Sequence, residues 1–172
     1  MGSVAPLRMT SYALSRLASA AAILLAAAAA RADEGSFDLL LVGQRNLTVI
    51  SVGDATISAG GAAGVATIVR SSGAPFAADA NASVQCVNHS RKAPAGFELE
   101  ADCVALFSAE DTIDFHFTRR TGDLTAGTSG GGAETLTDGT GRFAGVKGDC
   151  TYQVDNLANH WNVTRSKCSW HR

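Results

Sequence analysis

"TDGTGRFAGVKGDCTYQ" (residues 137–153) decides the fold, because its four glycines could form a phosphate-binding loop, a turn that carries a nucleophile, or bends of a β-sheet. The glycines follow a G-x-G-x-x-x-G pattern rather than the dinucleotide-binding fingerprint, and Lys147 lacks the preceding glycine of a P-loop. Both motifs also require a helix after the loop, whereas the continuation "DCTYQV" (149–154) is typical of a strand. The glycines are therefore predicted to shape a sheet.

Two positions in this stretch predict specific backbone features. Asp138-Gly139 follows the strand-like "AETLT" (133–137) and predicts a two-residue hairpin turn, since both central residues of such a turn need a positive φ. Gly145 and Gly148 fit a bulge or bend, which a sheet that closes on itself needs at its corners.

The neighbouring "GTSGGG" (127–132) formally matches the G-x-S-x-G pattern of a serine nucleophile. A nucleophile elbow needs a helix after Ser129, and no helical pattern follows it. We expect these consecutive glycines to turn the chain between two strands.

After residue 33 the chain consists of short segments rich in β-branched and aromatic residues, separated by clusters of Gly, Asp, Asn, Ser or Pro. No segment there keeps a helical period of 3.6 residues. The pattern predicts a single all-β domain, a sandwich or a barrel. "GDATISAGGAAGVA" (53–66) is compatible with a strand, a bulge and a turn, or with a loop. The predicted strands are 37–42, 46–52, 65–70, 83–88, 97–107, 112–119, 133–137, 149–154 and 162–170.

The same part of the chain contains all four cysteines: Cys86, Cys103, Cys150 and Cys168. An even number in an oxidising compartment favours two disulfides, and zinc binding is disfavoured because no Cys-x-x-Cys pair is present. The first two are centred on the Pro94-Ala95 turn and the last two on Asn159, so each pair would face directly across an antiparallel hairpin. Of three possible connectivities, 86–103 and 150–168 are favoured. Each would contribute about 3 kcal/mol to stability in the chain-entropy model.

The N-terminus has the features of an export signal. Arg8 and Arg16 precede the uncharged run "LASAAAILLAAAAA" (17–30), which is too short to span a bilayer and ends at Ala30-Arg31-Ala32, a signal peptidase pattern. An uncleaved membrane anchor is the alternative. We expect a signal peptide over residues 1–32, a domain over residues 33–172, and a secreted or periplasmic location.

Charge and composition disfavour nucleic-acid binding, membrane insertion and metal or cofactor binding. Removal of the leader takes away three arginines and no acid, so the formal net charge moves from −2 to −5, which is unfavourable for binding nucleic acid. No second long apolar run predicts a membrane-spanning helix, and aromatic residues are too sparse for the girdles of an outer-membrane barrel. Metal and cofactor binding are not predicted, since no histidine has a partner at metal-ligand spacing.

"GGAETLTDGTGRFAGVKGDCTYQV" (131–154) resembles the late-strand signature of allene oxide cyclase and dirigent-type β-barrels. "ADCVALFSAEDTIDFHFTRRTGD" (101–123) is similar to the preceding strand in small secreted bacterial relatives of that family. The resemblance implies a single antiparallel, eight-stranded, calycin-like barrel with an interior cavity. The plant enzymes of the family cyclise an unsaturated fatty-acid epoxide, and dirigent proteins direct phenoxy-radical coupling. No catalytic residue of either matches a position here.

One predicted strand, "TIDFHFTR" (112–119), supplies the candidate ligand-binding residues, Asp114 and His116. Side chains alternate along a strand, so these two share one face while Ile113, Phe115 and Phe117 share the other. We expect the apolar face to point into the barrel. The alternative directs Asp114 and His116 inward, where they could orient a polar ligand group or move a proton.

These observations favour a non-enzymatic binding module for a small apolar ligand or a surface partner. A cyclase-like enzyme that uses the barrel cavity and a purely structural or interaction protein are the alternatives. The oligomeric state is not predicted.

Overall fold

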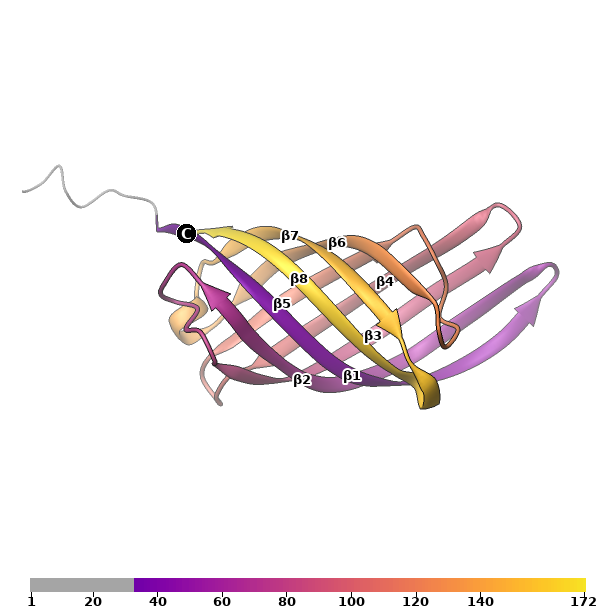
Figure 1. Cartoon of the computed structure of the whole chain (residues 1–172), viewed down its shortest axis with the longest axis horizontal. Coiled ribbons are helices and arrows are strands. Elements are labelled where there is room, and N and C mark those ends of the chain that lie inside the picture. The colour runs from indigo at the N-terminus through magenta and orange to yellow at the C-terminus, as the bar shows by residue number, and fades with distance from the viewer. Residues whose placement is uncertain (1–32) are drawn as a thin grey trace, which may run out of the picture. The chain divides into compact units, whose positions relative to one another are not determined.

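The computed structural model describes residues 33–172, which form one compact unit (Figure 1). The expected signal peptide, residues 1–32, lies outside the described residues. The elements are β1 (Glu34–Val52), β2 (Ala55–Ser71), β3 (Asn81–Ala93), β4 (Gly96–Leu106), β5 (Thr112–Arg119), β6 (Ser129–Gly139), the short 3₁₀ helix η1 (Gly141–Phe143), β7 (Lys147–Asn156), the 3₁₀ helix η2 (Ala158–His160) and β8 (Trp161–His171).

The eight strands form a closed barrel in which each strand pairs with its neighbours in the sequence, and β1 pairs with β8 to close it. All pairings are antiparallel. The all-β class and the eight-stranded barrel are confirmed, and the architecture is consistent with a calycin-like barrel.

The two ends of the barrel differ. The start of β1, the end of β8 and the β2–β3, β4–β5 and β6–β7 connections lie at one end of the barrel, here called the terminal end. The β1–β2 and β3–β4 hairpins extend furthest at the opposite end, here called the hairpin end (Figure 1). Aromatic side chains fill the terminal end: Phe76, from the β2–β3 connection, stacks on Phe37 with ring centroids 3.9 Å apart and also contacts Phe143 and Trp170. These rings close the lumen at that end.

Alternation along the strands determines which residues fill the lumen. In β5 the buried side chains are Ile113, Phe115 and Phe117, as the period-2 pattern predicts, together with Arg119 at the end of the same face. Both disulfides, Cys86–Cys103 and Cys150–Cys168, are present, and their Cα atoms are 4.0 Å apart.

The disulfide registers are those expected. Ala93 pairs with Gly96 around the Pro94-Ala95 tip, and Asn156 pairs with Asn162 around Asn159. Three of the four cysteines are buried, so the disulfides add covalent links to the core as well as between strands.

One predicted break between strands is wrong, and one segment that the sequence left open is resolved. The break at 43–45 does not exist, because β1 runs without interruption from Glu34 to Val52, with β2 along its length and β8 as far as Gln44. Pairing from two neighbours overrides the weak strand propensity of Gly43. The ambiguous segment 53–66 consists of a two-residue turn followed by β2.

The predicted hairpin turn at Asp138-Gly139 is also wrong. Both residues belong to β6, where Gly139 pairs with Ile113 of β5. The register between β6 and β7 pairs Leu136 with Gly148, which centres the connection on Arg142. The positive φ of 56° occurs at Gly141, within a longer connection that contains η1.

Candidate functional site

The hairpin end of the lumen contains a cavity of about 80 Å³. Apolar side chains from opposite sides of the barrel form most of its wall, and the Cys86–Cys103 disulfide contributes to it. The polar side chains that reach the cavity come from five strands. The lining residues are Leu41, Arg45, Ala62, Cys86, Asn88, Leu99, Ala101, Cys103, Phe117, Arg119, Leu124, Tyr152, Val154, Asn162 and Thr164.

Arg119 is the most deeply buried charged group at the cavity, with 2 % of its surface exposed. It ends β5 on the same face as Phe117, and its guanidinium lies 5.0 Å from the ring of Phe97. Nη2 donates a hydrogen bond to the carbonyl of Asp123 at 2.9 Å. Nε and Nη1 are buried and have no acceptor among residues 33–172. Burial lowers the pKa of Arg119.

Arg45 reaches the same cavity from β1. Its Nη2 donates to the carbonyl of Leu124 at 3.3 Å, while Nε is buried without an acceptor in the described part of the chain. Burial lowers the pKa of Arg45, and the positive charge of Arg119 lowers it further. Two side chains with positive charge therefore line one cavity.

Glycines in β6 provide the space for this arrangement. A Cβ at Gly130 would lie 2.8 Å from Nη1 of Arg119, and a Cβ at Gly132 would lie 2.7 Å from the ring of Tyr152. Residues 130–132 are inside β6, so the "GGG" run does not turn the chain between two strands. The turn expected over 127–132 is wrong in this respect. Because glycine has no side chain, these positions leave room for the large inward-pointing side chains of Arg119 and Tyr152.

The β5–β6 loop (120–128) borders the cavity, because Leu124 forms part of its wall. Asp123 holds the loop in place: its carboxylate accepts hydrogen bonds from Lys92 Nζ at 2.7 Å, the Thr125 backbone N–H at 2.8 Å and Thr128 Oγ1 at 2.9 Å. These bonds, that from Lys92 first, hold the pKa of Asp123 well below its usual range. The Asp123 carboxylate is consequently committed to the loop.

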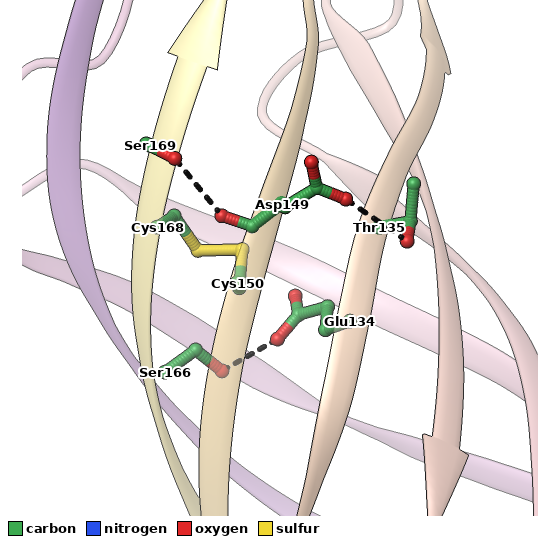
Figure 2. Close-up of a disulfide and its surroundings, with 7 residues drawn as sticks. All are labelled: Glu134, Thr135, Asp149, Cys150, Ser166, Cys168 and Ser169. Atoms are coloured by element: carbon green, nitrogen blue, oxygen red, sulfur yellow. Dashed lines mark hydrogen bonds between the residues drawn. A yellow bond between two sulfur atoms is a disulfide. The ribbon is translucent and has the colours of Figure 1, made fainter.

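A second polar group lies deeper in the lumen, beside the Cys150–Cys168 disulfide (Figure 2). Glu134 of β6 is 1 % exposed, and its Oε2 accepts a hydrogen bond of 2.6 Å from Ser166 Oγ of β8. Burial raises the pKa of Glu134 to about 7, although the bond from Ser166 opposes the shift. Glu134, Cys150 and Cys168 are the one cluster of three residues within 33–172 whose side chains could ligate a metal, but both sulfurs form the disulfide.

The predicted candidates Asp114 and His116 lie on the other face of β5 and do not line the cavity. Nδ1 of His116 contacts Oδ1 of Asp102 on β4 at 2.8 Å, with side chains 36 % and 83 % exposed respectively. The structure brings neither candidate toward Arg119 or Glu134. Their role in ligand binding stays a prediction.

Sequence reasoning missed the polar residues that do reach the lumen. The alternation that places Ile113 and Phe117 inside also places Arg119 inside, and the alternation of Leu136 does the same for Glu134. This alternation could therefore have identified Arg119 and Glu134 from the sequence. It could not have identified Arg45, because Arg45 lies in the predicted strand break at 43–45.

Comparison of the chain with models of protein families, with curated proteins and with solved structures finds no match. Within the described residues, no helix is long and apolar enough to cross a membrane. The barrel architecture and the lumenal cavity are therefore the basis for a functional assignment.

Proposed function

We propose that this protein is an exported, non-enzymatic β-barrel that binds a small ligand in its lumen. One observation carries the proposal: the barrel is filled by aromatic side chains at the terminal end but keeps an apolar-walled cavity of about 80 Å³ at the hairpin end. Concave, largely apolar sites with a few polar groups are typical of small-molecule binding.

The ligand should remain with the protein during gentle purification from its own source. Native mass spectrometry then detects a mass in excess of the polypeptide, and denaturation releases it. Ala62 lines the cavity, so Ala62→Leu fills part of the space and should abolish retention. Its neighbour Ala63 is exposed and does not line the cavity, which makes Ala63→Leu the matched control. Equal retention by the two folded variants would contradict a lumenal site.

A further inference from the structure

We propose that the cavity binds a small monocarboxylate whose carboxylate lies between the guanidinium groups of Arg119 and Arg45, with its short apolar body against Leu41, Phe117 and Val154. The inference rests on the proposed lumenal binding function and names the chemical class of the ligand.

The first argument is an excess of hydrogen-bond donors at the cavity. Nε and Nη1 of Arg119, Nε of Arg45 and Nδ2 of Asn88 are all buried without an acceptor within residues 33–172. All three residues line the cavity. Guanidinium and amide N–H groups only donate, so a ligand that satisfies them must present acceptors. Leaving such donors unpaired in a low-dielectric interior is costly.

The second argument is charge. The lining contains two arginines and no acidic residue. The carboxylate of the adjacent Asp123 already accepts bonds from Lys92 and two threonines. Burial lowers the pKa of Arg119 by more than the charge of Asp123 raises it, so the buried cation is only partly compensated, and an anionic ligand would compensate both guanidinium groups.

The third argument is the match of shape and polarity. A carboxylate is planar, and its two oxygens fit the parallel N–H groups of a guanidinium fork. Most of the remaining wall is apolar and includes Leu41, Leu99, Phe117, Val154 and the Cys86–Cys103 disulfide, beside the polar Tyr152, Asn162 and Thr164, and this balance favours a carbon body over a bare inorganic anion. The cavity volume of about 80 Å³ restricts that body to a few carbons.

The test compares butyrate with butyramide, its neutral isostere, on the whole exported protein by isothermal titration calorimetry at constant ionic strength. Butyrate should bind at least tenfold more tightly than butyramide. Arg119→Met and Arg45→Met should each weaken butyrate binding at least tenfold and leave butyramide binding within twofold. Arg120 is the matched control, because it is exposed and paired with Glu98 and Glu100, so Arg120→Met should change neither affinity.

Several results would overturn the carboxylate assignment. Equal affinity for the two probes would do so while leaving lumenal binding intact, because the neutral isostere would still enter. Inorganic phosphate binding as tightly as butyrate would show a bare anion site, and an equal loss in Arg120→Met would show surface attraction. If Arg119→Met fails to fold, the proposal is tested by Arg45→Met and by the preference of the unmodified protein for butyrate over butyramide. Absence of butyrate binding overturns this inference, whereas the proposed function fails only on the retention experiment.

Discussion

The Glu134 carboxyl couples stability to pH because it is enclosed beside a disulfide with Ser166 as its hydrogen-bond donor. Its pKa in the folded protein is about 7, against 4.5 for an ordinary glutamate, so the folded state binds the proton more tightly than the unfolded state. The associated stability is fully present below pH 4.5 and is lost as the pH rises to about 7. The loss amounts to about 3 kcal/mol.

Glu134→Gln should remove this dependence, since an amide keeps an acceptor for Ser166 and does not ionise. Urea unfolding at several pH values between about 4 and about 8 measures the effect. The difference in unfolding free energy between the variant and the unmodified protein should grow in favour of the variant as the pH rises. Glu100→Gln, at an exposed position, is the control. Parallel pH curves for Glu134→Gln and the unmodified protein would contradict the assignment.

Asp114 and His116 carry a different expectation, because both lie on the outer face of β5. Asp114→Ala and His116→Ala should each change the free energy of unfolding by no more than about 0.5 kcal/mol, as surface substitutions usually do. Ligand retention should be unaffected in native mass spectra. Loss of ligand in either folded variant would restore the two residues as binding residues.

At the scale of the element, β6 combines a row of glycines with large inward-pointing neighbours. A Cβ at Gly132 would lie 2.2 Å from the backbone oxygen of Thr118, which cannot move without disturbing β5. A Cβ at Gly131 would instead approach the end of the Gln153 side chain, which is flexible. The two neighbouring glycines thus differ in what surrounds them.

Gly132→Ala should therefore destabilise the barrel by about 1–3 kcal/mol, the usual range for overpacking. Gly131→Ala should change stability by no more than about 0.5 kcal/mol. Chemical denaturation of both variants provides the measurement. Similar effects at the two positions would show that overlap with Thr118 and Tyr152 is not what requires a glycine at position 132.

At the scale of the whole molecule, two disulfides with sequence separations of 17 and 18 restrict the unfolded chain. In the chain-entropy model each contributes about 3 kcal/mol. Reduction should lower the midpoint of denaturant unfolding, and Cys86→Ala/Cys103→Ala should reproduce about half of the loss. Peptide mapping without reduction checks the starting state. A linkage that crosses the two hairpins, or free thiols in the exported protein, would exclude this account.

Export is the second expectation for the whole molecule. The Ala30-Arg31-Ala32 pattern predicts cleavage that leaves residues 33–172. The intact mass of the exported protein measures this directly. A retained leader would remove the argument for an oxidising compartment, although the disulfide registers would be unaffected.

Local patterns in the sequence predicted much of the fold. Period-2 alternation predicts the buried face of β5, and the symmetric spacing of the cysteines around Pro94-Ala95 and Asn159 predicts two hairpin registers. These features depend on residues close together in the chain, so turn chemistry and strand geometry suffice to infer them. The same alternation contained the information that Arg119 and Glu134 point inward.

The amino-acid sequence predicts the strand-rich class and the alternating faces, and it favours the observed disulfide pairing. The positions where strands continue or end, and the polar residues that meet, follow from the folded barrel. β1 continues through Gly43 because β2 and β8 both pair with it. Position 130 of β6 favours a glycine because Arg119 occupies the space beside it. Arg45 and Arg119 meet at one cavity only because β1 pairs with β8 and closes the barrel. Contacts between strands distant in the chain depend on closure and packing, which no local pattern encodes.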